Sequence, residues 1–95
     1  MERKWPLYPE SIKSLEKMGE NIKLARKRRH MSGKELAERA FISLPTLWKI
    51  EKGDPSVSIG AYAQVLLGLS LTNDFEKVAS DDELGRKLQD LDLLK

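Results

Sequence analysis

The polar side chains of this chain favour binding over catalysis. The sequence has one histidine, His30, and no cysteine, so it offers no credible catalytic triad, no thiol nucleophile and no cluster of soft metal ligands. We therefore expect no enzyme activity, no metal and no cofactor. Cations are plentiful instead, as in the run KLARKRRH from Lys23 to His30. Such groups suit phosphates and the edges of nucleic-acid bases.

The segment Ser43–Gly53, SLPTLWKIEKG, combines groups that suit base edges. The Lys49 ammonium group can donate to guanine O6 and N7, and the methyl groups of Leu44 and Thr46 can meet the methyl group of thymine. The segment has no Arg, Asn or Gln for a bidentate base contact, each of which is worth about 1–3 kcal/mol of discrimination. We expect phosphate contacts and DNA shape to supply much of any specificity.

Charge is divided unevenly along the 95 residues, whose net charge is +2. Residues 1–53 hold 13 Lys and Arg against 7 Asp and Glu, a charge of +6, and residues 54–95 hold 4 against 8, a charge of −4. A basic half favours a polyanionic partner, and an acidic half favours either solvation or a basic protein partner. The alternative is that charge simply fluctuates along a short chain.

The elements that position these groups are expected to be helices, because apolar residues recur at steps of three and four. Ser32 and Glu35 form a capping box that opens one helix, and Ser43 caps the next, with Pro45 in its first turn. Gly53 ends that helix. The inward side should carry Leu47, Ile50 and Glu51, and the outward side Leu44, Pro45, Thr46, Trp48 and Lys49.

Three further helices are expected around this pair. The first buries Ile12, Leu15, Gly19, Ile22 and Ala25; the fourth, capped by Ser58, buries Ile59, Tyr62, Ala63, Leu66 and Leu67; a short fifth begins at Thr72 or Asn73. The fold class is thus all-α, a compact bundle of about five short helices over residues 11–79. An extended arm, 1–10, precedes it, and an acidic amphipathic tail, 80–95, follows. The tail should open with a capping box from Ser80 to Glu83 and carry Leu84, Leu88 and Leu91 on one stripe.

Two capped helices joined by the three-residue connection FIS form a helix-turn-helix. The sequence resembles the Xre/Cro/cI-type helix-turn-helix domain over residues 19–69, through S-x-x-E-L-A at the second helix and I-S-x-x-T-L-x-x-I-E-x-G across the third. The fold it implies is lambda-repressor-like. Residues after Leu67 resemble, over a shorter stretch, the C-terminal region of HipB-like antitoxins encoded beside HipA-type kinases.

The resemblance implies roles for particular residues. Arg26 and Glu51 match a buried ion pair between the first and third helices. The base-facing positions correspond to Leu44, Pro45, Thr46 and Lys49. Phosphate contacts are expected from Ser32, Gly33, Lys34, Ser43, Lys52, Ser56 and Arg28.

The sequence departs from the pattern at two positions. Gly33 stands where the second helix usually carries a Gln that braces phosphate, and Phe41 stands in the turn where Gly is common. A bulky residue at Phe41 is strained if the backbone there requires a positive φ. Trp48 has two possible positions: against the sugar-phosphate backbone of DNA, or packed on a neighbouring element, which we favour.

Together these features predict a cytoplasmic, sequence-specific DNA-binding repressor that binds a two-fold symmetric operator as a homodimer. The second resemblance implies an antitoxin that represses its own operon and binds a HipA-type kinase toxin, with Leu84, Leu88 and Leu91 as partner-binding residues. These leucines are equally compatible with docking on the parent domain, with dimerisation and with binding another protein. No apolar run is long enough for a membrane span, and no small-molecule ligand is evident. The alternatives are a stand-alone Xre-type, phage-like regulator and a helix-turn-helix adaptor that binds proteins and not DNA.

Overall fold

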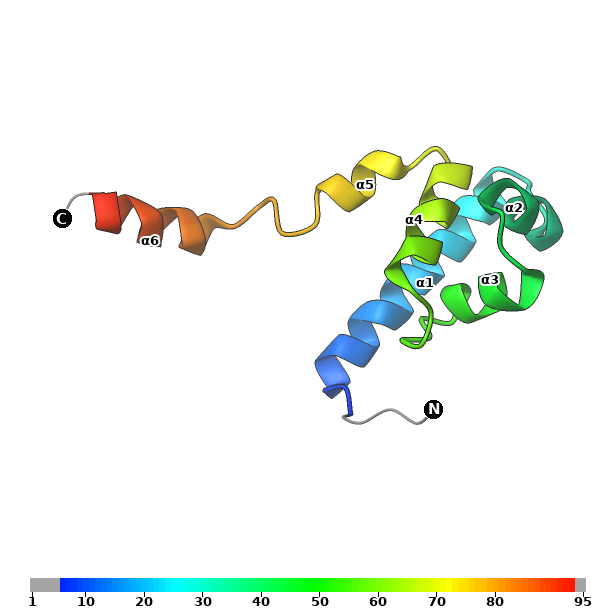
Figure 1. The fold of residues 1–95 in the computed structure, drawn as a ribbon, viewed down its shortest axis with the longest axis horizontal. Coiled ribbons are helices and arrows are strands. Elements are labelled where there is room, and N and C mark those ends of the chain that lie inside the picture. Colours follow the sequence, from blue (N-terminus) through cyan, green and yellow to red (C-terminus); the bar gives the residue numbers. More distant parts are fainter. Residues whose placement is uncertain (1–5, 94–95) are drawn as a thin grey trace.

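The structure is a computed structural model that describes residues 6–93 (Figure 1). Over these residues the chain is all-helical, with six helices and no strand, which confirms the expected class. None of the helices in this range combines the length and the apolar character that a membrane span requires. The helices are α1 (Pro9–Arg28), α2 (Gly33–Ala40), α3 (Leu44–Glu51), α4 (Ile59–Gly68), α5 (Thr72–Glu76) and α6 (Glu83–Leu93).

The molecule is less compact than expected. Its radius of gyration is 16.5 Å, against about 12 Å for a compact chain of this length. Helices α1 to α4 form a body, and Figure 1 shows the chain leaving it through α5 towards α6 along the longest axis. The expected bundle of short helices is wrong for α1, which is 20 residues long. Helix α6 lies outside the body (Figure 1), where the amphipathic tail was expected.

Helix α1 begins earlier than the sequence suggested. Pro9 is its first residue, a position where a proline costs no hydrogen bond because the first N–H groups of a helix have no partner within it. Pro9 and Glu10, which were expected in the extended arm 1–10, therefore belong to α1. Residues 1–5 of that arm lie outside the described residues.

Side-chain caps set the start of α2, α3 and α4, as predicted. The Ser32 hydroxyl accepts from the backbone N–H of Glu35 at 3.0 Å, and the Glu35 carboxylate accepts from the Ser32 N–H at 2.9 Å. Ser43 and Ser58 cap α3 and α4 in the same way, through the N–H groups of Thr46 and Ala61. These local bonds satisfy donors that have no partner inside the helix.

The predicted cap of α6 is wrong. The Ser80 hydroxyl donates to the carbonyl of Lys77 at 2.7 Å, and the Asp82 carboxylate accepts from the N–H of Gly85 at 3.0 Å. Asp82 therefore caps α6. In the sequence SDDE, Ser80, Asp81 and Asp82 could each cap a helix. Ser80 does not cap α6, because its hydroxyl closes the turn to Lys77.

The core lies where α2 packs on α4 and α1 packs on α3. The inner face of α4 differs from the prediction: Val65 and Leu69 are buried, whereas Ile59 and Leu67 are exposed. Helix α4 is apolar around most of its surface, so spacing alone does not identify the side that packs. The most deeply buried large side chains of the core are Leu36, Leu47, Ile50, Val65 and Leu69.

Two glycines bring α1 against the end of α3. A Cβ at Gly19 would lie 2.6 Å from the carbonyl oxygen of Ile50, and a Cβ at Gly53 would lie 2.6 Å from the backbone of Leu15. Gly53 also has a φ of +78°, which other residues rarely adopt. The helix stop predicted at Gly53 is therefore confirmed, and the same residue permits the close approach that orients α3.

Candidate nucleic-acid interface

A buried ion pair fixes the orientation of α3 relative to α1. The Nε of Arg26 donates to Oε2 of Glu51 at 2.7 Å, and Nη2 donates to Oε1 at 3.1 Å. The third donor, Nη1, reaches the carbonyl of Met31 at 3.0 Å. The hydrogen bonds to Glu51 raise the pKa of Arg26 above its ordinary value. Such a bidentate pair sets direction as well as distance, so α3 has little freedom to rotate.

Trp48 packs on its own chain. Its ring lies over the guanidinium group of Arg26, 5.6 Å from ring centroid to Cζ. A Cβ at Gly33 would overlap Cη2 of the indole and lie 3.0 Å from Cζ2 and Cζ3. Gly33 is buried for this reason. We call Trp48, Gly33 and Arg26 the Trp48 junction, because they join α3, α2 and α1.

In the free chain Trp48 takes the packed position, which leaves the outer part of the indole accessible. The indole packs on a neighbouring element, and that element is α2 of the same chain. The side chain keeps 42% of its surface exposed. Beside it lies a hollow of about 200 Å³ lined by Lys23, Trp48, Glu51 and Lys52. An aromatic edge and two ammonium groups therefore share one surface.

The outward side of α3 has a small set of polar groups. Pro45 and Lys49 are exposed, whereas Leu44 and Thr46 are half-buried. Leu44 packs partly against the core. The hydroxyl of Thr46 lies 2.8 Å from the Ser43 hydroxyl and shares a hydrogen bond with it. The outward side of α3 is thus accessible at Pro45 and Lys49 and more limited at Leu44 and Thr46.

The residues expected to contact phosphate have different surroundings. Ser32, Lys34, Ser43, Lys52, Ser56 and Arg28 are exposed, and Gly33 is covered by the indole. The N–H of Ser32 already donates to Glu35, and the bonds from the Ser32 backbone and hydroxyl lower the pKa of Glu35. An ionised carboxylate therefore stands at the start of α2.

A carboxylate also lies beside the end of α3. Asp54 accepts from the N–H of Ser56 at 2.8 Å. Bonds from the side chain and backbone of Ser56 lower the pKa of Asp54, and the charge of Lys49 contributes in the same direction. The field of Lys49 is therefore partly compensated within the chain.

Several cations of the first three helices are not neutralised by an ion pair within the described chain. Glu51 is committed to Arg26, and the exposed ion pairs of the described chain involve Lys17, Lys77, Arg86 and Lys87. Among the cations of α1, α2 and α3 and at the C-cap of α3, the following have no ion-pair partner in residues 6–93: Lys23, Lys27, Arg28, Lys34, Lys49 and Lys52. Lys23 and Lys52 line the hollow beside Trp48, and Arg28 lies on the side of α1 that faces α4 and α5.

The leucines predicted to bind a partner are not part of this surface. Leu84, Leu88 and Leu91 lie on α6, away from the body (Figure 1), and are 68%, 54% and 58% exposed. The structure brings no other helix against their stripe strongly enough to bury any residue of α6.

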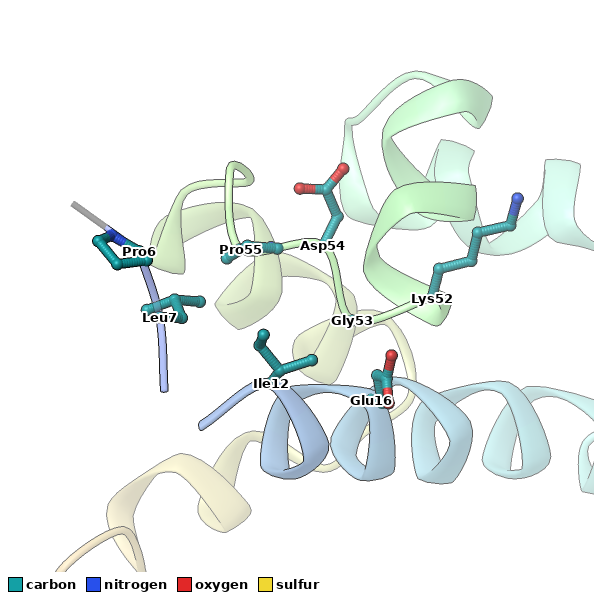
Figure 2. A pocket seen from close by; sticks show the side chains of 8 residues that line it. All are labelled: Pro6, Leu7, Ile12, Glu16, Lys52, Gly53, Asp54 and Pro55. Atoms are coloured by element: carbon teal, nitrogen blue, oxygen red, sulfur yellow. The ribbon is translucent and has the colours of Figure 1, made fainter. Parts of the chain in front are cut away.

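Sequence patterns did not reveal an apolar groove on the body, at the side where α1, α4 and α5 meet. It has a volume of about 400 Å³, and Leu7 and Pro55 lie at its edge. Figure 2 shows the adjoining hollow, in which Leu7 and Pro55 stand near Ile12, with Lys52 and Asp54 directed away. The signal from the sequence is mixed, because Leu15 and Ile59 were expected on inner faces of helices, whereas Met18 and Val57 were expected on none. The groove is lined chiefly by Leu15, Met18, Val57, Ile59, Phe75 and Val78.

No cluster of potential metal ligands occurs within residues 6–93. Comparison with models of protein families, with curated proteins and with solved structures gave no match. The function therefore has to be inferred from the chemistry of the surface around α3 and of the groove.

Proposed function

We propose that this chain is a sequence-specific DNA-binding repressor, with α2 and α3 as a lambda-repressor-like helix-turn-helix and α3 as the helix that enters the major groove. One observation carries the proposal: α3 has an accessible outward side, where Lys49, and Lys23 and Lys52 beside Trp48, have no ion-pair partner in residues 6–93. A short helix that lies beside cations suits a groove between two phosphate backbones.

The side chains of α3 divide by chemistry. Lys49 is the group for a guanine edge, and Pro45 and Leu44 offer apolar contacts with thymine. The hydroxyl of Thr46 is already shared with Ser43, which favours contact through its methyl group. With one cationic base contact, direct readout is limited, so phosphate contacts and DNA deformability supply much of the specificity.

The candidate phosphate contacts lie before and after α3 in the chain. Lys34 and Arg28 lie at the start of α2 and the end of α1, and Lys52 and Ser56 follow α3. Ser43 holds the N-terminus of α3, where the helix dipole favours an anion. Ser32 contributes through its hydroxyl, because its N–H is bonded to Glu35.

Binding as a homodimer follows from the size of the contact. One helix of 8 residues touches few base pairs, and two copies spaced about 34 Å apart along the DNA double the contacts. The finer proposal is a HipB-like antitoxin that represses its own operon and binds a HipA-type kinase toxin. Helix α6 and the body surface are its candidate protein-binding elements.

A salt titration tests DNA binding. Fluorescence anisotropy of labelled DNA from upstream of the gene should give an affinity that falls steeply with salt, with a log–log slope that corresponds to several phosphates. Lys49→Ala should weaken binding unequally among operator variants by about 1–3 kcal/mol at the most affected base pair. Lys77→Ala, which removes the same charge far from α3, is the matched control.

Two results would contradict the proposal. The first is weak binding without salt dependence. The second is equal loss of affinity in Lys49→Ala and Lys77→Ala for every DNA sequence, since charge alone would then explain it. Either result favours the protein-binding adaptor.

A further inference from the structure

We propose that α6 of one copy docks in the apolar groove of a second copy, and that the exchange is reciprocal. The proposal goes beyond DNA binding and gives a mechanism for the homodimer that the proposed function requires. It rests on two unpartnered apolar surfaces of the same chain. One is the leucine stripe of α6 and the other is the groove between α1, α4 and α5.

The two surfaces match in chemistry, because both are apolar. Leu84, Leu88 and Leu91 follow one another at steps of four and three and form a narrow stripe along α6. The groove holds about 400 Å³ and is lined almost wholly by apolar side chains. Two of these, Ile59 and Val78, are 76% and 70% exposed. A stripe of leucines entering such a groove removes apolar area on both sides from water.

Charge favours the same pairing. Residues 6–80 carry 12 Lys and Arg against 9 Asp and Glu, a charge of +3, whereas residues 81–93 carry 2 against 5, a charge of −3. The acidic helix is therefore attracted to the basic body. A basic protein would bind α6 for the same electrostatic reason, but it would leave the groove open.

The connection between α5 and α6 disfavours docking within one chain. The N–H and the hydroxyl of Ser80 both donate to the carbonyl of Lys77, at 3.0 and 2.7 Å. Arg86 of α6 donates to the carbonyl of Ser80 at 2.8 Å. Val78, which lines the groove, is only four residues before Asp82, the cap of α6. To fold back onto its own groove, the chain would have to reverse within this short turn and lose these bonds.

Reciprocal exchange doubles the contact that one helix can make. Helix α6 has 11 residues and therefore forms a contact about 16 Å long and 10 Å wide. Each contact covers roughly 320 Å² over its two faces, and two cover roughly 640 Å², the size of a weak and reversible complex. Exchange of an identical element between two copies gives a closed two-fold dimer.

Sedimentation velocity without DNA tests the proposal on the full chain. The native chain should form a dimer. Leu88→Glu should weaken self-association roughly a hundredfold, because each dimer has two altered contacts and each loses about tenfold. Leu93→Glu is the matched control: it places the same charge on the opposite face of the same helix, where Leu93 is 77% exposed, and should leave the dimer intact.

Mixing two defective chains distinguishes exchange from every other arrangement. Ile59→Glu alters the groove at an exposed residue and keeps α6, whereas Leu88→Glu alters α6 and keeps the groove. Each chain alone should be monomeric. A mixture should recover part of the dimer, because α6 of the first chain still fits the groove of the second. Both substitutions then fall in the other contact, where the second one costs little once the first has removed the contact. Circular dichroism verifies that both variants are folded.

The proposal is overturned if the native chain is monomeric at every concentration, if Leu88→Glu leaves the dimer unchanged, or if the mixture shows no gain over its parts. Loss of kinase binding alone in Leu88→Glu, with an intact dimer, would assign α6 to the toxin instead. The outcome is separate from the salt titration with DNA. A dimer that does not bind DNA contradicts the proposed function but still supports the docking of α6 in the groove of a second copy.

Discussion

Substitution of Gly33 tests the packing of the Trp48 junction. In Gly33→Ala the new methyl group would overlap Cη2 of the indole and lie 3.0 Å from Cζ2 and Cζ3. The ring lies over Arg26, which two hydrogen bonds hold to Glu51, so it can retreat only towards solvent and the hollow beside it and then loses its packing on α2. Either the indole or the start of α2 must move.

The size and the sign of the effect follow from two opposing terms. Overpacking of a well-filled site costs about 1–3 kcal/mol. Alanine in place of glycine favours the helix by at most about 1 kcal/mol, and by less in the first turn. We therefore expect Gly33→Ala to lower the free energy of unfolding by about 1 kcal/mol, a fall in Tm of roughly 4–8 °C for a domain of this size.

The sign should reverse when the indole is removed. In a Trp48→Ala background the space above Gly33 is free, so only the helix propensity remains and Gly33→Ala should stabilise by a few tenths of a kcal/mol. Urea unfolding of the four chains, followed by circular dichroism, gives the coupling energy, which we expect to be about 1–3 kcal/mol. Gly60→Ala is the control, because its Cβ would meet nothing closer than the Ser58 hydroxyl, at 3.8 Å.

A coupling energy near zero would refute this account. If Gly33→Ala stabilised the chain equally with and without the indole, then Trp48 would not occupy the space above Gly33 in solution. If Gly33→Ala destabilised the chain equally with and without the indole, the new methyl group would clash with α2 itself and not with Trp48. Gly60→Ala should stabilise the chain modestly in both backgrounds. If it does not, the higher helix propensity of alanine is not what offsets the overpacking at Gly33.

Two further substitutions test the turn after α2 and the buried ion pair. Phe41 has φ 55° and ψ 41° and is 88% exposed, so Phe41→Gly should relieve a left-handed conformation that costs about 1–2 kcal/mol and raise the midpoint of urea unfolding. Phe41→Ala, which keeps a Cβ, should not raise it, and equal stability of the two variants would contradict the strain. Glu51→Gln should destabilise by about 3–5 kcal/mol, because it leaves the buried Arg26 charge without its partner; a loss below about 1 kcal/mol would show that the pair is solvated.

Features encoded by neighbouring residues were predictable from the sequence. The capping box of Ser32 and Glu35, the cap at Ser43 and the stop at Gly53 each depend on residues only a few positions apart. The strain anticipated at Phe41 has the same local origin, since the residue after α2 takes a positive φ. Local hydrogen bonds and backbone sterics decide such features before any tertiary contact forms.

Features that depend on tertiary contacts were not predictable. Ile59 and Leu67 were expected in the core, but Val65 and Leu69 are buried there, because α4 offers apolar residues on several sides and α2 selects one. The groove joins residues from Leu7 to Val78, so no window of sequence contains it. The position of Trp48 likewise depends on Gly33, fifteen residues earlier.

Gly33 and Trp48 form one feature of the surface, because the small residue makes room for the large one. In the sequence, the absence of a phosphate-bracing Gln at Gly33 and the position of Trp48 are unrelated features. In the structure the indole occupies the space that any side chain at Gly33 would need. Under the proposed function, an indole edge beside Lys23 and Lys52 then replaces an amide at the DNA backbone. The contact there would depend on charge and packing, and hence on salt, more than on a directed hydrogen bond.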